Sequence, residues 1–235
     1  MAKKKIRKKG KVAKKPGPEL SIALSKGALF NGALALFQQI GIRVNAPSTE
    51  DRELSFTDRD RRFRFLIVRP ADVPVYVEQG AVDIGIAGKD VLEEGGNRVA
   101  EMLDLQFGGC QLVLAVPQVS RISSAQELPS GSRVATKFTR LTEKYFSRLE
   151  KPVEIVKLYG SVELAPSTHL ADAITDLTAS GKTLRKLGLK VVDVIMESSA
   201  RLIANPVRLK VKYKEIWELC SELSAKGISK KKFKK

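Results

Sequence analysis

The segment that most constrains the fold is residues 170–184, LADAITDLTASGKTL. Its first half is an apolar run that carries Asp172 and Asp176, and its second half passes through small residues into a helix expected to begin at Leu184. This order predicts a strand, a tight turn and a helix. Because strands followed directly by helices build α/β sheets, an α/β fold is expected.

The turn in this segment has the composition of a phosphate-binding loop. The first N–H groups of a helix lack intrahelical partners, and the helix dipole adds partial positive charge, so an anion fits there. Gly181 would allow close backbone approach, and hydroxyl and ammonium groups would add donors. Asp176, just upstream, would accept hydrogen bonds from ribose hydroxyls, so the segment predicts a ribose 5-phosphate site. The expected loop residues are Ala179, Ser180, Gly181, Lys182 and Thr183.

Two other interpretations of the turn exist. A nucleoside-triphosphate P-loop requires a glycine five residues before Gly181, and Asp176 stands there. An ordinary turn into a helix capped by a threonine would explain the local pattern without a ligand. The two acids favour the ligand-binding interpretation.

The net charge of +16 is concentrated at the two ends of the chain. Residues 1–18 and 226–235 together hold 15 Lys or Arg and no acid, which leaves the rest of the chain nearly neutral. These ends are expected to be a basic disordered arm and a basic tail. They contain no interleaved aromatic pattern, so specific nucleic-acid binding is not expected.

Other residue counts narrow the function. Cys110 and Cys220 lie far apart without metal-binding spacing, and His169 is the only histidine, so neither a zinc site nor a Ser-His-Asp mechanism is indicated. No apolar run is long enough to span a bilayer, and the N-terminal segment lacks an apolar export signal. A cytoplasmic protein without membrane contact is therefore expected.

Strand and helix patterns alternate along the chain and predict two α/β lobes that share a crevice, each with a mixed, mainly parallel sheet. Residues 50–65 suit a hairpin or edge strands, and Asp72 is a plausible N-cap for the helix after Pro70. The expected strands are 20–24, 65–68, 82–87, 112–116, 133–136, 153–158, 190–197 and 199–204. The expected helices lie near 30–40, after 70–74, and at 91–94, 141–149 and 207–223.

Several further motifs occur in order along the chain. They are LSKGAL at 24–29, VRPADVPVYVEQGAVDIGIAGKDVL at 68–92, LDLQFGGC at 103–110 and GSVELAP at 160–166, followed by the segment described first. With these motifs the chain resembles the short form of ATP phosphoribosyltransferase over nearly all of residues 20–223.

The resemblance implies a two-lobed fold similar to type II periplasmic binding proteins, with the active site between the lobes. It implies transfer of the phosphoribosyl group of 5-phosphoribosyl 1-pyrophosphate to N1 of ATP, with release of pyrophosphate, as the first step of histidine biosynthesis. Mg²⁺ would be carried by the pyrophosphate, without a metal site supplied by the protein. The alternative function is a non-enzymatic two-lobed solute-binding protein.

The expected partner is a regulatory subunit resembling histidyl-tRNA synthetase, in a hetero-octamer; the catalytic subunit alone would be a homodimer. By the same resemblance, residues 19–107 and 195–225 form the nucleotide-side lobe, and 108–194 form the phosphoribosyl pyrophosphate-side lobe.

The resemblance also assigns roles to individual residues. The phosphate loop falls on 179–183, and the ribose-binding acids fall on Asp172 and Asp176, the latter with a catalytic role. Lys26 and Arg52 would face ATP phosphates or pyrophosphate as catalytic cations, although either fits a solvated position. Residues assigned to substrate binding elsewhere are Glu163 at the phosphoribosyl site and Gly88, Asp90 and Cys110 on the nucleotide side.

Some of these residues also fit a purely structural role, and two positions depart from the family pattern. Glu163 could be an acid favoured by a helix N-terminus, and Cys110 a small buried residue between lobes. The family usually has arginine where this chain has Ala28, and glycine where it has His169.

Overall fold

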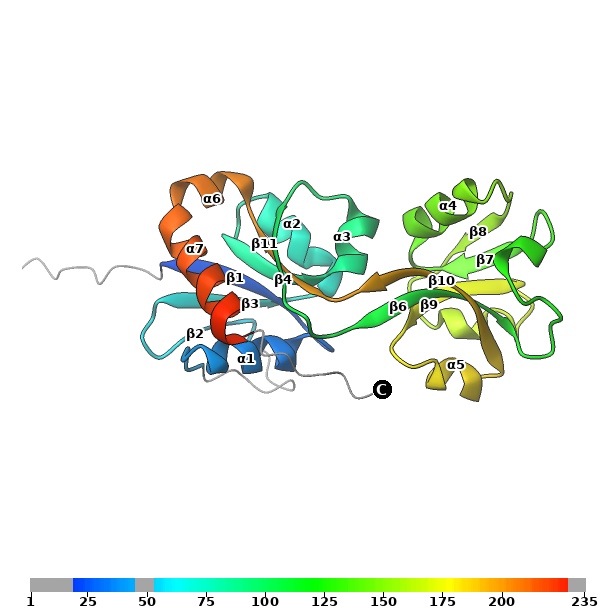
Figure 1. The fold of residues 1–235 in the computed structure, drawn as a ribbon, viewed down its shortest axis with the longest axis horizontal. Coiled ribbons are helices and arrows are strands. Elements are labelled where there is room, and N and C mark those ends of the chain that lie inside the picture. The colour runs from blue at the N-terminus through cyan, green and yellow to red at the C-terminus, as the bar shows by residue number, and fades with distance from the viewer. Residues whose placement is uncertain (1–18, 45–52, 228–235) are drawn as a thin grey trace, which may run out of the picture.

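The computed structural model describes residues 19–44 and 53–227 (Figure 1). The predicted arm 1–18, the predicted tail from residue 228 onward, and Arg52 lie outside the described residues. The described chain forms two lobes, each built on one β-sheet, and we call them the first and second lobe in chain order (Figure 1).

The first lobe holds a six-stranded sheet in the order β2-β3-β1-β4-β11-β5. In the middle of the sheet β1 runs parallel to β3 and β4, whereas β2, β11 and β5 pair antiparallel. The strand bounds are β1 Leu20–Ser25, β2 Ser55–Thr57, β3 Phe63–Val68, β4 Ile84–Gly88, β5 Ala100–Asp104 and β11 Ala200–Ala204.

Helices cover both faces of this sheet. On one face α1 and α7 pack against the larger apolar core, which includes Phe37, Phe65 and Ile216. On the other face α2 supplies Val73 and Val77 to a smaller cluster, against which α3 also packs. The helix bounds are α1 Phe30–Gln39, α2 Val73–Glu78, α3 Lys89–Gly95, α6 Pro206–Val211 and α7 Tyr213–Glu222.

The second lobe holds a five-stranded sheet in the order β10-β6-β9-β7-β8. Alternate residues of β9 face opposite sides, as the pleat of a strand requires: Ala173 packs in the cluster that includes Phe146 of α4, and Ile174 packs with Leu184 of α5. The bounds are β6 Cys110–Pro117, β7 Arg133–Thr136, β8 Glu154–Lys157, β9 Ala173–Thr178, β10 Leu189–Ser198, α4 Thr139–Arg148 and α5 Lys182–Lys186.

Short helical turns complete the described structure. They are η1 Pro70–Asp72, η2 Ala125–Glu127, η3 Val162–Leu164 and η4 Leu223–Gly227, the last a π-turn. None of the helices in the described ranges is long and apolar enough to cross a membrane.

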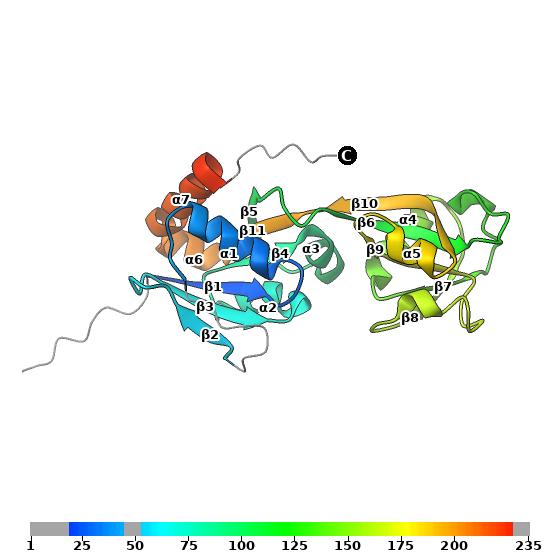
Figure 2. The same ribbon diagram turned by 90° about the horizontal axis from the view of Figure 1, so that it is seen from below.

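The chain passes between the lobes twice. It first crosses from β5 to β6, and it returns from β10 to β11 with only Ser199 between the two strands (Figure 2). These crossing strands pair antiparallel, so parallel pairs are two of five in the first sheet and two of four in the second. The expected mixed sheets are present, but parallel pairing does not predominate.

Some predicted elements differ in detail. The helix expected over 207–223 is two helices that meet at Lys212, whose φ of −116° lies outside the helical region. The helix after the phosphate loop begins at Lys182 instead of Leu184. Asp72 occupies the N-cap position of α2, but its side chain makes no capping hydrogen bond. Strand β5 was not predicted.

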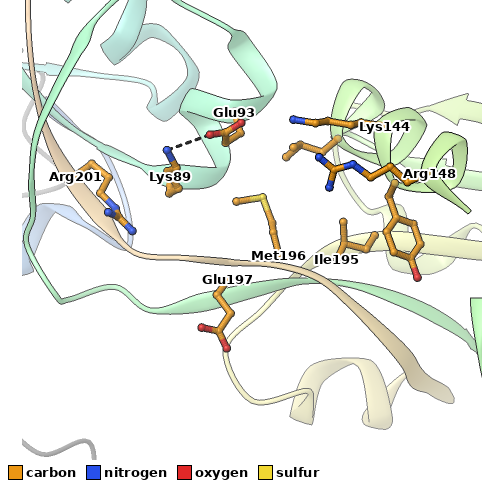
Figure 3. Close-up of a pocket in the computed structure, with 10 residues that line it drawn as sticks. Lys89, Glu93, Lys144, Arg148, Ile195, Met196, Glu197 and Arg201 are labelled. Atoms are coloured by element: carbon orange, nitrogen blue, oxygen red, sulfur yellow. Dashed lines mark ion pairs between the residues drawn. The ribbon is translucent and has the colours of Figure 1, made fainter.

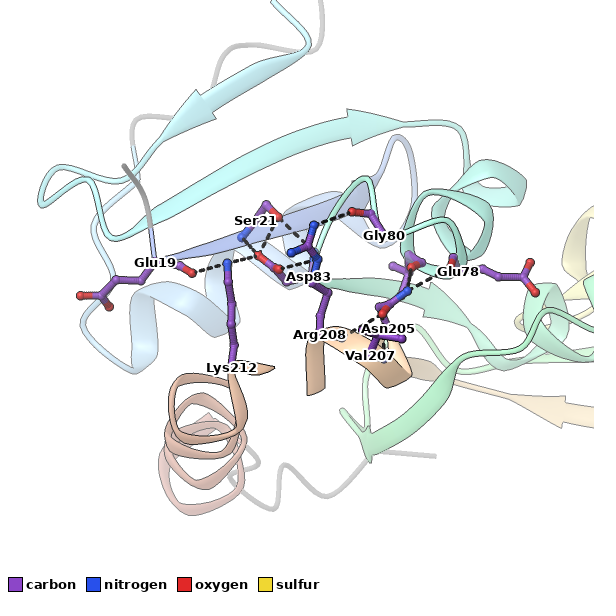
Figure 4. Close-up of polar contacts among 10 residues, drawn as sticks. Glu19, Ser21, Glu78, Gly80, Asp83, Asn205, Val207, Arg208 and Lys212 are labelled. Atoms are coloured by element: carbon purple, nitrogen blue, oxygen red, sulfur yellow. Dashed lines mark hydrogen bonds and ion pairs between the residues drawn. The ribbon is translucent and has the colours of Figure 1, made fainter. Parts of the chain in front are cut away.

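A buried carboxylate holds the end of the chain against the first strand. Asp83 is 3% exposed, and its Oδ2 accepts hydrogen bonds from Ser21 N, Ser21 Oγ and Lys212 Nζ at 2.8, 2.8 and 2.9 Å (Figure 4). Arg208 Nε lies 3.6 Å from Asp83 Oδ1. The break between α6 and α7 therefore coincides with the residue that reaches the buried acid.

Candidate functional site

The parallel strands of the first lobe end at one edge of the sheet and place basic side chains there. Lys26 follows β1 and Arg69 follows β3, and they are adjacent because Lys26 N donates to Val68 O at 2.8 Å. Both side chains are exposed. Gly27, next to Lys26, has a φ of +102°, a backbone conformation that favours glycine. The strand β1 points toward the second lobe (Figure 2).

The third parallel strand of this lobe, β4, ends at Gly88, and Asp90 follows in the first turn of α3. Asp90 is 6% exposed; its N–H donates to Ser198 Oγ at 3.0 Å, and Ser198 Oγ donates to Asp90 Oδ1 at 2.6 Å. A side chain at Gly88 would collide with Asp90 Oδ1. Gly88 therefore fits the close approach of that carboxylate.

Cys110 lies beside this pair, because it is opposite Ser198 in the β6–β10 ladder. Burial and the negative charge of Asp90 raise the pKa of the Cys110 thiol, and a hydrogen bond with Ser198 and the positive charge of Lys137 offset part of that rise. The structure thus brings together the predicted nucleotide-side residues Asp90 and Cys110 where the lobes join.

In the second lobe the predicted phosphate loop forms the turn between β9 and α5. Gly181 adopts a left-handed conformation with φ +67° and ψ 0°, and its N–H donates to Thr178 Oγ1 at 2.8 Å. Ala179, Ser180 and the side chains of Lys182 and Thr183 are exposed. The first N–H groups of α5 have no intrahelical acceptor and remain available to an anion.

Asp176 lies on β9 just before this loop. Its Oδ1 is buried and lacks a hydrogen-bond partner among the described residues, while Lys137 Nζ stands 3.6 Å away. A buried carboxylate oxygen without a hydrogen bond is costly unless a ligand or water completes it. Asp176 and the loop therefore form an arrangement suited to a ligand with hydroxyl and phosphate groups.

Lys137 was not among the sequence-predicted site residues. It follows β7, which runs parallel to β9 with Thr136 opposite Thr175. Since adjacent parallel strands end at the same edge, the residue after β7 lies beside the end of β9. A basic residue directly after a predicted strand was the only signal in the sequence that could have identified it.

The structure does not bring Asp172 to the phosphate loop. Asp172 precedes β9 at its other end, four residues before Asp176, which along a strand is about 13 Å. Its Oδ2 accepts a hydrogen bond from Arg133 N at 2.8 Å. Asp172 therefore ties the start of β9 to Arg133 and lies away from the turn where the ribose 5-phosphate was expected.

Glu163 lies in η3, after Ser161, whose φ of +50° marks a tight left-handed turn. Its side chain is partly buried. Arg52, the second predicted catalytic cation, lies outside the described residues.

A separate pocket of about 280 Å³ lies between α3, α4 and β10 (Figure 3). Two of its basic residues are already paired: Lys89 Nζ with Glu101 Oε2 at 2.8 Å, and Arg201 with Glu101 and Asp104. Its lining includes none of the predicted site residues. We therefore place the candidate site at the strand ends and not in this pocket. The lining residues are Lys89, Glu93, Leu141, Lys144, Tyr145, Arg148, Ile195, Met196, Glu197 and Arg201.

Within residues 19–44 and 53–227, no three His, Cys, Asp or Glu side chains are grouped so that they could hold a metal ion. The groups that gather at the strand ends are instead cations, backbone N–H groups and isolated carboxylates. Such a donor set suits a phosphorylated ligand.

The fold and the strand-end loops define a two-lobed α/β protein of the type II periplasmic-binding-protein class. The periplasmic aliphatic sulphonate binding protein SsuA from Escherichia coli has this fold, with a TM-score of 0.59 at 14% identity over 88% of this chain and 68% of that one. At this identity the likeness concerns the fold alone.

Proteins of higher sequence identity show to which family within this fold class the chain belongs. The HisG family model, described as ATP phosphoribosyltransferase, matches residues 69–225. A protein of Gloeothece citriformis with that name is 48% identical over 201 residues, 84% of this chain and 94% of the relative. One from Synechococcus sp. (strain JA-2-3B'a(2-13)) is 47% identical over 90% of this chain and 94% of the relative. The chain belongs to the ATP phosphoribosyltransferase family.

A solved structure agrees with this placement. The ATP phosphoribosyl transferase (HisG:HisZ) complex from Thermotoga maritima contains a chain that matches with a TM-score of 0.73 at 30% identity, over 87% of this chain and 96% of that one. The family and the two-lobed fold expected from the sequence motifs are both confirmed.

Proposed function

We propose that the protein transfers the phosphoribosyl group of 5-phosphoribosyl 1-pyrophosphate to N1 of ATP, the first step of histidine biosynthesis. Family membership supports the reaction class. The observation that assigns the reaction to a site concerns Asp176, which lies beside the Gly181 turn and Lys137. Its buried Oδ1 has no hydrogen-bond partner within the part of the chain that the structure describes. The ribose hydroxyls of the donor would complete that carboxylate, and its 5-phosphate would occupy the turn.

The proposed chemistry needs no strong base from the protein. Adenine N1 is a neutral nucleophile, so positioning and charge stabilisation supply most of the rate enhancement. As the bond from ribose to pyrophosphate breaks, positive charge develops on the sugar and negative charge on the leaving group. Asp176 would stabilise the former, and Lys26 and Arg52 the latter.

The remaining predicted residues divide between the two substrates. In this proposal Ala179, Ser180, Lys182 and Thr183 bind the donor phosphate with Gly181, and Glu163 lines the same side. The nucleotide side comprises Gly88, Asp90 and Cys110, which meet where the lobes join.

Mg²⁺ would enter with the pyrophosphate and offset its charge. The unpartnered Oδ1 of Asp176 is compatible with this role, because it can accept a hydrogen bond from a hydroxyl group or from water bound to the metal. Cationic side chains at the strand ends would bind the phosphate oxygens that the metal leaves free.

We also propose that the chain is a short-form catalytic subunit in the cytoplasm. Its partner would be a regulatory subunit resembling histidyl-tRNA synthetase, in a hetero-octamer, and the subunit alone would form a homodimer. The support is the match to a chain of the HisG:HisZ complex from Thermotoga maritima.

The test is a spectrophotometric assay with ATP, the pyrophosphate donor and Mg²⁺, in which N1 substitution of adenine changes the ultraviolet absorbance. Product is expected, with more formed when the regulatory subunit is added. Asp176→Ala should lower turnover by about a hundredfold, the scale of a lost transition-state contact. Asp72→Ala, at an exposed position without a capping bond, is the matched control and should retain activity. If the wild-type protein forms no product either with or without the regulatory subunit, the proposed function is refuted.

The solute-binding alternative is not favoured. The match to a sulphonate-binding protein is at 14% identity, whereas the named transferases reach 48%. Calorimetry separates the two, because a transferase should bind the phosphoribosyl donor in preference to a small amino acid or sulphonate.

A further inference from the structure

The helix α4 of the second lobe lacks a cap of its own. Its N-cap residue, Phe138, makes no side-chain capping bond, and its first turn contains no acid. The first N–H groups of any helix need acceptors, which a Ser, Thr, Asp or Asn at the N-cap usually provides. Here the acceptor comes from elsewhere in the fold.

Glu94 of the first lobe supplies it. Arg140 N donates to Glu94 Oε1 at 3.1 Å, and Leu141 N donates to Glu94 Oε2 at 3.0 Å. Thr139 Oγ1 donates to Oε1 at 3.3 Å. The two N–H groups belong to the second and third residues of α4, the groups that a capping side chain normally binds. The carboxylate also lies at the positive end of the helix dipole.

The contact is reciprocal. The guanidinium of Arg140, at the start of α4, lies against Gly96, which ends α3 in a left-handed conformation with φ +62°. A side chain at Gly96 would displace the Arg140 guanidinium, because Arg140 Nη1 occupies that space. A cation at a helix C-terminus is favourable for the same dipole reason as an anion at an N-terminus. The two helices of different lobes therefore each place a charge at an end of the other.

Neighbouring charges agree with this pairing. A hydrogen bond from Lys89 lowers the pKa of Glu93, and the positive charges of Lys144 and Arg140 on α4 lower it further. Glu93 and Lys144 both line the pocket between α3 and α4 (Figure 3). The first lobe thus presents acids, and the second lobe presents cations and a helix N-terminus, at one contact.

The same two helices carry candidate site residues at their starts. Asp90, beside Ser198 and Cys110, precedes Glu94 by one helical turn and so lies on the same face of α3. Lys137, beside Asp176, comes two residues before Thr139 at the start of α4. The distance between the two halves of the site therefore depends on how α3 sits against α4.

We propose that Glu94 is a positioning residue that fixes the separation of the two lobes by capping α4, and so aligns the nucleotide with the phosphoribosyl donor. The catalytic part of this inference rests on the proposed function; the effect on lobe separation does not. The loop proposed for the 5-phosphate lies wholly in the second lobe, so binding of the ribose 5-phosphate part of the donor is independent of Glu94.

The experiment compares Glu94→Ala and Glu94→Gln with the wild-type protein. Spin labels carried by non-natural amino acids at exposed Lys214 in α7 and Ser147 in α4 report the distance between lobes by electron–electron double resonance, in protein diluted with unlabelled chains. Steady-state kinetics and calorimetric binding of ribose 5-phosphate are measured on the same variants. Glu127→Ala is the matched control, because Glu127 also accepts one backbone N–H and one hydroxyl, both from Ser123 within the second lobe.

Glu94→Ala should broaden the interlobe distance distribution and lower kcat by about tenfold, since misalignment of two bound substrates reduces the reactive population. Affinity for ribose 5-phosphate, which contacts only the second lobe in this proposal, should stay within twofold of wild type. Glu94→Gln, which keeps a carbonyl acceptor, should recover part of both losses. Glu127→Ala should lower thermal stability without changing the distance distribution or kcat.

A wild-type distance distribution in Glu94→Ala would overturn the proposal, as would a kcat loss equal to that of Glu127→Ala. Absence of turnover in the wild-type protein would instead refute the proposed function and the catalytic part of the inference. The distance measurement would still decide whether Glu94 fixes the lobe separation.

Discussion

Replacing Asp83 with alanine should destabilise the first lobe by about 3 kcal/mol, because this change strands buried polar groups. Ser21 loses the acceptor of its backbone N–H and its hydroxyl, and Lys212 loses a partner at 2.9 Å. Hydrogen bonds to a charged group contribute about 1.5–3 kcal/mol each, so the two from Ser21 to the carboxylate give about 3 kcal/mol at the low end of that range. The Lys212 pair adds less, because the Lys212 side chain is 28% exposed and solvent screens the pair. The 45%-exposed Arg208 adds little.

Urea denaturation at pH 7, followed by fluorescence, measures this loss. Trp217 is the only tryptophan and lies in α7, the helix that Lys212 precedes, so its emission reports detachment of the closing helices from the sheet. With a denaturant slope of about 3 kcal/mol per molar urea, the midpoint should fall by about 1 M. Far-ultraviolet circular dichroism should show whether the second lobe unfolds in the same transition.

Asp72→Ala is the matched control for stability, because the exposed Asp72 side chain makes no capping bond. It should change the free energy of unfolding by less than about 0.5 kcal/mol. A loss of less than about 1 kcal/mol for Asp83→Ala would show that water or nearby groups replace the missing acceptor. The buried network would then not be what holds α7 against β1.

Four shorter predictions follow from other contacts. Burial alone would raise the pKa of Asp83, but hydrogen bonds from Ser21 and Lys212 outweigh it and lower the pKa. The ionised Asp83 therefore stabilises the folded protein fully above its unfolded pKa near 3.8, and this stabilisation is lost as the pH falls through the lower pKa of the folded state. The stability gap between wild type and Asp83→Ala should therefore close only in strong acid in urea titrations. Gly181→Ala places a side chain at φ +67° and should weaken donor binding by about tenfold, or about 1.4 kcal/mol, in calorimetry. Asp172→Asn should leave donor affinity unchanged in the same measurement, since Asp172 lies at the far end of β9. A tenfold loss of affinity would instead show that Asp172 binds the ribose, as the sequence predicted. Burial raises the pKa of Cys220 to about 11, so a thiol reagent at pH 8 should modify Cys220 only after unfolding, as mass mapping would reveal.

Local sequence signals were sufficient for most strands and for the turn at Gly181. The run LSIAL, bounded by charged and small residues, is β1, and the turn at Gly181 required a left-handed residue where glycine stands. These features depend on neighbouring residues alone, so they can be inferred without tertiary information. The fragment AEMLD of β5 has no clear alternation, and its strand exists because β11 offers an edge for pairing.

Contacts set by strand register or by the packing of separate elements were not predictable. Asp172 and Asp176 are close in sequence, but an extended strand separates them by about 3.3 Å per residue. Lys137 reaches Asp176 only because β7 and β9 are neighbours in the sheet. The break at Lys212 likewise reflects a distant partner, Asp83, which overrides the helical periodicity of residues 207–223.

The connections between the lobes explain why a single carboxylate such as Glu94 matters. Only Ser199 separates β10 from β11, and Ser198 Oγ and Ser199 Oγ donate to Asp90 and Asp104 of the first lobe at 2.6 and 2.9 Å. The lobes can tilt about a connection this short, so the separation of the parts of the lobes that lie away from these strands is determined by the contacts made there. Among the described residues, the bonds from α4 to Glu94 join the two lobes away from these strands, where a small change of lobe angle produces a large displacement that the bonds oppose. The turn at Gly181 is formed within one lobe, whereas in our proposal its alignment with the other half of the candidate site depends on this contact between helices.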